Sequence, residues 1–207
     1  MSFSRDERVA LADLLLSVGP DAPTLCEGWS TRDLVVHLVL REYRPDAAAG
    51  MFFSPVEGRL RSVTRSYREL PYPELVERYR GGPPPWNPMR LLDPVVNFTE
   101  NFIHHEDVRR GGGEWSLRDL DAGERDALWK AVRLSARGFI VPSGPAVRFG
   151  RTDGPAGAVE ELTVGSGGPQ VGVTGPASEL LLWIFGRDKA CDVTVTGPVE
   201  RVVRRSL

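Results

Sequence analysis

Apolar residues recur at helical spacing through the first two thirds of the chain. Val9, Leu11 and Leu15 follow one another in this way after a capping pattern at residues 4–7. A second start signal at residues 30–33 leads into another apolar stretch, and glycine or proline residues end most of these segments. The expected helices span residues 4–18, 31–43, 56–70, 73–79, 93–110 and 121–137.

Downstream of residue 142 the pattern changes to short alternating or β-branched runs. The expected strands span residues 146–149, 159–164, 170–174 and 192–196, and one helix is expected over residues 176–185. The sequence therefore predicts a mainly α fold, with a helical domain over residues 1–141 and a small α+β domain over residues 142–207.

The composition narrows the classes of partner. The net charge of −2 and a few short arginine pairs do not make the basic stripe of a nucleic-acid-binding protein. The longest apolar run, residues 180–185, is far below the ~20 residues of a membrane span. The polar N-terminus argues against a signal or transit peptide, and two distant cysteines do not form a disulfide framework. We expect a cytoplasmic protein that binds neither nucleic acid nor membrane.

The candidate chemistry lies in the histidines, of which the chain has three: His37, His104 and His105. Glu100 precedes His104 by four residues, so both side chains lie on one face of the expected helix. On a wheel of 100° per residue, His105 falls on the opposite side. His37 lies in another expected helix, and with Glu100 and His104 it makes a three-ligand set with one position open, as in catalytic metal sites. Asp107 would support a ligand or a bound water.

Each of these residues also has an ordinary structural interpretation. A Glu-x-x-x-His pair is frequent on helices, and a histidine on an apolar face usually packs in the core. Asp107 has Arg109 and Arg110 nearby for a surface ion pair. The alternative is therefore a helical bundle that binds no metal. Cys26 is interpreted as a packed structural cysteine, and Trp29 as a core anchor where a helix begins.

Two stretches resemble signatures of the mycothiol-dependent maleylpyruvate isomerase family. Residues 24–38 contain a Gly-Trp pair, a helix cap and a His-Leu pair, and residues 100–107 read Glu-x-x-x-His-x-x-Asp. The resemblance implies a DinB-like four-helix bundle in which His37, Glu100 and His104 hold the metal. Residues 175–187 are similar to the small α/β domain of that family, which has a sterol-carrier-like fold.

The resemblance also implies a chemistry. The ion would be divalent, zinc or else nickel, and mycothiol or a similar small thiol would be the cosubstrate. The metal-bound thiolate would attack an electrophile, as an isomerase or an S-transferase. Asp107 would orient a ligand or the thiol, and Arg187 would bind the substrate carboxylate, with Arg201, Arg204 and Arg205 as competing candidates. The rival interpretation is a non-catalytic metal-dependent binding or regulatory module. Either protein would be a monomer or a homodimer.

Overall fold

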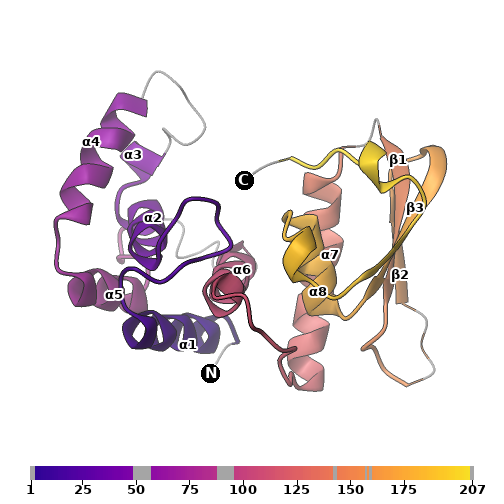
Figure 1. Cartoon of the computed structure of the whole chain (residues 1–207), viewed down its shortest axis with the longest axis horizontal. Coiled ribbons are helices and arrows are strands. Elements are labelled where there is room, and N and C mark those ends of the chain that lie inside the picture. Colours follow the sequence, from indigo (N-terminus) through magenta and orange to yellow (C-terminus); the bar gives the residue numbers. More distant parts are fainter. Residues whose placement is uncertain are drawn as a thin grey trace. The chain divides into compact units, whose positions relative to one another are not determined.

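The computed structural model describes residues 3–48, 57–87, 96–141, 144–156, 158 and 160–205. The chain divides into two compact units, Met1–Ser116 and Leu117–Leu207. The first unit is helical, and the second joins helices to a four-stranded sheet (Figure 1). The expected class, mainly α with a small C-terminal α+β part, agrees with this architecture.

The observed boundary lies earlier than the expected one at residues 141/142. Helix α7, Ala122–Phe139, packs against α8, Ala177–Ile184, and therefore belongs to the second unit. The expected capping box at the start of α7 is present, because Asp121 and Glu124 each accept the other's backbone N–H. The capping box and the amphipathic pattern predict the helix, but they do not identify the element that packs on its apolar face.

The helices of the first unit follow the expected order closely. They are α1 (Phe3–Val18), α2 (Thr31–Tyr43), α3 (Pro45–Ala48), α4 (Glu57–Arg68), α5 (Tyr72–Gly81) and α6 (Val96–Gly111). Pro45 ends the run of α2 and also begins the short helix α3. The expected start of α6 at residues 93–94 lies outside the described residues.

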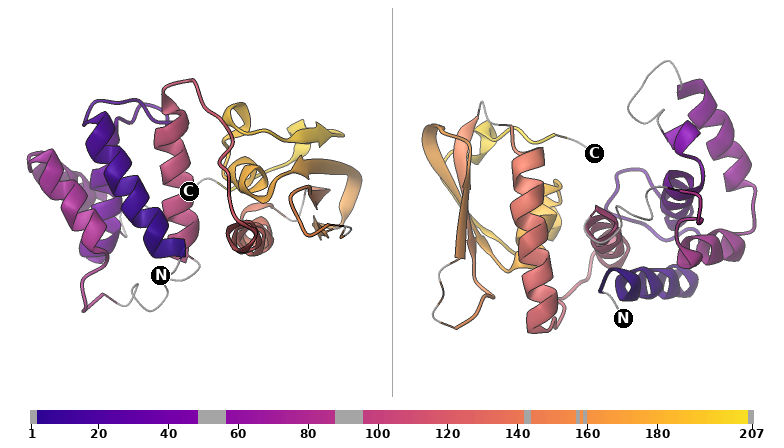
Figure 2. Two further views of the ribbon diagram at one scale, coloured as in Figure 1. Left: turned by 90° about the horizontal axis from the view of Figure 1, so that it is seen from below. Right: turned by 180° about the vertical axis from the view of Figure 1, so that it is seen from behind.

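The core of the first unit is built from the apolar faces of these helices. Helix α1 packs on α5 and α6, whereas α2 packs on α4 and α5. Figure 2 shows α1 in indigo alongside α6 in rose. Fully buried side chains fill the space between the helices: Leu11, Leu15, Leu34, Val35, Leu75 and Tyr79. Tight packing on both sides holds α2 in place, and with it the one candidate ligand that α2 carries.

The second unit has a sheet with the strand order β2-β1-β3-β4. The strands are β1 (Pro145–Arg151), β2 (Glu160–Val164), β3 (Gly167–Gly175) and β4 (Thr194–Thr196). β1 pairs antiparallel with β2 and parallel with β3, and β3 pairs antiparallel with β4. Two 3₁₀ helices, Asp188–Ala190 and Val199–Arg201, complete the unit.

Helices α7 and α8 lie on the same face of this sheet (Figures 1 and 2). Every residue of α8 is buried, and the ring of Trp183 lies 5.8 Å from that of Phe149 on β1. Most of the longest apolar run of the sequence, residues 180–185, therefore lies in a core helix of eight residues. Among the described residues, none of the helices combines the length and the apolar character that crossing a membrane requires.

Candidate metal centre

Helix α2 carries His37 toward α6. A capping box fixes the start of α2, because Asp33 N–H donates to Ser30 Oγ and Ser30 N–H donates to the Asp33 carboxylate. His37 follows one turn after Asp33, and its ring lies 5.5 Å from the ring of His104 on α6, at an interplanar angle of 70°. Two histidines far apart in sequence are thereby adjacent in space.

Glu100 joins these two histidines from α6. Its Oε2 lies 3.4 Å from His104 Nε2, as expected for a spacing of four on one helix face. One potential ligand atom each from His37, Glu100 and His104 lies within 4.8 Å of the others. A tetrahedral zinc ion holds its ligand atoms about 3.3 Å apart, given bonds of ~2.0–2.1 Å. Small side-chain rotations would therefore close the set around one ion.

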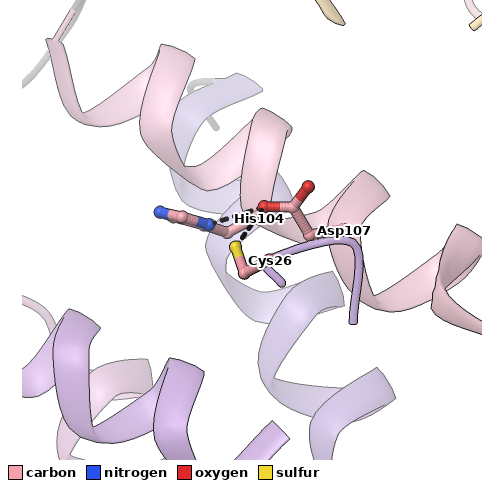
Figure 3. Close-up of side chains that lie close together, drawn as sticks. All are labelled: Cys26, His104 and Asp107. Atoms are coloured by element: carbon pink, nitrogen blue, oxygen red, sulfur yellow. Dashed lines mark hydrogen bonds and ion pairs between the residues drawn. The ribbon is translucent and has the colours of Figure 1, made fainter. Parts of the chain in front are cut away.

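His104 has a second set of partners at its other ring nitrogen. Its Nδ1 lies 2.9 Å from Asp107 Oδ2, and the Cys26 thiol donates to the same oxygen at 3.2 Å. Figure 3 shows His104 and Asp107 extending from α6 toward Cys26, which lies on the loop before α2. These three side chains form a second group with ligand atoms close enough to hold a metal ion. The supporting role expected of Asp107 fits its contact with the imidazole.

A close backbone approach brings Cys26 to this position. The loop before α2 crosses the end of α6 at Gly111, where a Cβ atom would lie 2.6 Å from Thr24 Cα. Leu25 N–H also donates to the backbone carbonyl of Asp107 at 3.0 Å. Only glycine permits this approach, and the loop is thus fixed against α6 with Cys26 facing Asp107.

The environment controls the charge of each group. Burial and the neighbouring His104 lower the pKa of His37 to about 3, so its imidazole is neutral and keeps a free lone pair near neutral pH. Burial opposes ionisation of Glu100, but the His104 hydrogen bond and the Arg41 charge prevail and lower its pKa to about 2. Burial disfavours the charged form of His104. Hydrogen bonds with Asp107, Cys26 and Glu100 outweigh this effect and raise its pKa well above the usual value.

The side chains of the centre differ in their exposure to solvent. His104 is 5% exposed and Asp107 is 0% exposed, whereas His37 and Cys26 are partly exposed. Trp29 is 37% exposed, and its ring lies 5.2 Å from that of His37. The interpretation of Trp29 as a core anchor was therefore wrong. Its indole borders the partly exposed side of the centre.

The third histidine has a different role. His105 points away from His104, as the helical wheel predicted, and its Nδ1 lies 2.7 Å from Glu7 Oε1 on α1. This buried pair joins α6 to α1. Arg109 and Arg110 pair with Glu106 on their own helix, whereas Asp107 is fully buried and contacts His104 and Cys26. The surface ion pair considered for Asp107 is not the arrangement observed.

Arg187, the candidate for substrate binding, lies in the second unit. Its Nη1 donates to the Phe185 carbonyl at 2.6 Å. Among its competitors, Arg204 pairs with Asp188 and donates to the Trp183 carbonyl, while Arg201 and Arg205 are exposed. Arg187 belongs to a different unit from His37, Glu100 and His104, and its role remains a prediction.

Comparisons of the chain with models of protein families, with curated proteins and with solved structures found no match. The geometry of the centre and its chemistry therefore carry the functional argument.

The contact between Asp107 and His104 predicts a measurable effect on metal binding. Asp107→Ala should weaken zinc binding by about 10–100-fold, because the carboxylate orients the imidazole through Nδ1. Cys26→Ala is the matched comparison, since it removes a second contact to Asp107 and leaves the His104–Asp107 contact intact. It should change the dissociation constant less than Asp107→Ala does. Competition with a chromophoric chelator measures both constants, and equal effects of the two variants would contradict this role for Asp107.

Proposed function

We propose that the chain binds one divalent metal ion through His37, Glu100 and His104 and uses it to activate a low-molecular-weight thiol. The observation that carries this proposal is the convergence of two imidazoles and a carboxylate within 4.8 Å, on two helices packed in one unit. Two histidines and one glutamate form a donor set typical of catalytic zinc sites, which keep a position for an exchangeable ligand. The residues present therefore fit a divalent ion, zinc first and nickel second.

The side chains of the centre have distinct parts in this proposal. His37 is neutral, so it offers a lone pair without losing a proton, and Glu100 supplies the negative charge that a cation requires. Asp107 holds the Nδ1 side of His104, which leaves Nε2 facing Glu100. A bound divalent cation would stabilise a thiolate and so lower the pKa of a ligating thiol.

The thiolate is the nucleophile of the proposed reaction. In an isomerase, its sulfur would add to an activated double bond, rotation would follow about the resulting single bond, and the thiol would leave unchanged. In an S-transferase, the sulfur would form a lasting bond to carbon, and the leaving group, such as the halide of an aryl halide, would depart with the electron pair of the bond that breaks. Arg187 is our candidate for binding a substrate carboxylate through its planar fork of donors. Mycothiol, or a thiol like it, is the proposed cosubstrate, in a cytoplasmic setting.

The resemblance to the maleylpyruvate isomerase family supports the same ligands by a separate route. We accordingly propose a DinB-like bundle for the helices of the first unit. Two features of the fold agree with that proposal: the ligands come from α2 and α6, and α1, α2, α5 and α6 pack around a shared apolar core. The sterol-carrier-like description of the second unit stands as a proposal on the same footing.

Cobalt substitution tests the thiol chemistry directly. Metal-free protein loaded with Co²⁺ should develop a near-ultraviolet sulfur-to-cobalt charge-transfer band when a small thiol is titrated in. Cys26→Ala should give the same band, which shows that the sulfur comes from the added thiol. A cobalt-loaded protein whose spectrum does not respond to any thiol would contradict the proposal.

Turnover then separates an enzyme from a binding module. The zinc-loaded protein should consume an electrophile, with maleylpyruvate for isomerisation and an aryl halide for transfer, only when a thiol is present. Saturable thiol binding without consumption of either electrophile would instead indicate the non-catalytic metal-dependent module.

A further inference from the structure

The centre already contains a cation at its carboxylate. Arg41 lies on α2 one turn beyond His37, and its Nη1 forms an ion pair with Glu100 Oε2. The same oxygen is the one that lies 3.4 Å from His104 Nε2. The guanidinium therefore contacts the carboxylate oxygen that faces the imidazole, which is the oxygen best placed to share a metal ion with His104.

Partial burial strengthens the attraction between Arg41 and Glu100. The side chains of Arg41 and Glu100 are 19% and 14% exposed, so solvent only partly screens their attraction. An arginine does not lose its proton in proteins, so this cation is permanent, unlike a protonated histidine. The charge of this partly buried carboxylate is therefore balanced by Arg41 when no metal is bound.

We propose that Arg41 is an internal competitor of the metal: it occupies Glu100 in the metal-free protein, and a divalent ion must displace it to bind. This inference rests on the proposed site of His37, Glu100 and His104. Arg41 would thus weaken metal binding and make the bound ion exchangeable. It would also keep the metal-free unit folded, because it neutralises Glu100 between α2 and α6.

The opposite role for Arg41 makes the opposite prediction. If Arg41 held Glu100 in the orientation that a metal needs, its removal would weaken metal binding, as loss of a supporting contact usually does. If Arg41 competes with the metal, its removal strengthens metal binding. The sign of the change therefore decides between positioning and competition.

Arg44 supplies a matched control. It lies three residues after Arg41, at the C-cap of α2, and it pairs with Asp46 through Nε and Nη2, both at 2.9 Å. Arg44→Gln removes the same charge from the same end of the helix without touching Glu100. An effect that came only from the net charge near α2 would appear in both variants.

The experiment measures zinc affinity and thermal unfolding on metal-free wild type, Arg41→Gln, Arg41→Lys and Arg44→Gln. Arg41→Gln should bind zinc about 10–100-fold more tightly, the usual worth of one charge-assisted hydrogen bond. The same variant should unfold at a lower temperature without metal, and zinc should raise its unfolding temperature more than that of wild type. Arg41→Lys keeps the charge but loses the fork, so its affinity should lie between the two. Arg44→Gln should bind zinc within about twofold of wild type, since Arg44 is partly exposed and pairs with Asp46.

The outcomes separate this inference from the function on which it rests. Weaker or unchanged zinc binding by folded Arg41→Gln would overturn it while leaving the metal site intact. If Arg41→Gln does not fold, Arg41→Lys decides by the same sign. Zinc binding by Arg41→Gln but not by wild type would support the inference strongly. A lack of zinc binding by wild type and by every Arg41 variant would overturn both proposals.

Discussion

Zinc content is expected to fall from about one equivalent in the wild-type protein to near zero in His37→Ala and in His104→Ala. Each substitution removes one of three donors, and two donors hold a divalent ion far more weakly than three. The loss should exceed the roughly 10–100-fold that removal of a supporting residue costs. The zinc affinity should fall most in His104→Ala, because His104 belongs to both groups of side chains whose ligand atoms converge. Plasma mass spectrometry on protein purified without a metal-affinity column measures the content.

Glu100→Gln and His105→Gln make this experiment specific. Glu100→Gln keeps the shape of the side chain but removes its charge, so it should also lose zinc. His105→Gln replaces the neighbouring histidine, which pairs with Glu7 and takes no part in the proposed site. It should retain zinc even if it lowers stability. If the wild-type protein holds no metal after incubation with zinc, the histidines are buried core residues. Unchanged zinc content in His37→Ala and His104→Ala would support the same conclusion.

Local signals predicted the elements and the pair on α6. The start of α2 could be predicted from Ser30 and Asp33, because a capping box involves only residues that are close in sequence. The approach of Glu100 to His104 follows from the helical repeat alone. The side of α6 taken by His105 follows from the same repeat. Such features require nothing beyond one turn of helix.

Sequence patterns did not predict the contacts between segments that are far apart in the chain. Cys26 contacts Asp107, which lies 81 positions later in the sequence, and no local pattern predicts this contact. Gly111 is the nearest signal, since it ends α6 where the loop crosses, but a glycine after a helix normally reads as a helix end. Arg41 was within reach of sequence reasoning. It shares a helix face with His37 at a spacing of four, and a buried glutamate needs a cationic partner. The boundary between the units was missed because α7 covers α8.

Loss of Glu42 is expected to destabilise the first unit by about 3–5 kcal/mol, because it removes the carboxylate that pairs with a buried arginine. Arg8 on α1 pairs with Glu42 on α2 through both guanidinium nitrogens, at 2.5 and 3.0 Å. Arg8 also donates to the Tyr79 carbonyl at 2.8 Å and lies over the Tyr79 ring. The two charged residues are only 6% and 8% exposed. This network ties α1, α2 and α5 together one helix turn away from the candidate centre.

Two controls show whether burial is the cause. The pair Glu74–Arg78 has a similar separation of 2.7 Å but is 45% and 38% exposed, so Glu74→Ala should cost only about 0.3–0.5 kcal/mol. Replacing both buried partners, as Arg8→Met with Glu42→Leu, should recover much of the stability lost in Glu42→Ala, because no charge is then buried alone. Urea unfolding followed by hydrogen exchange in peptides of α1 and α2 reports on this unit. Equal costs for Glu42→Ala and Glu74→Ala would mean that water screens both pairs alike, and that α2 is held by its apolar contacts rather than by the arginine beneath it.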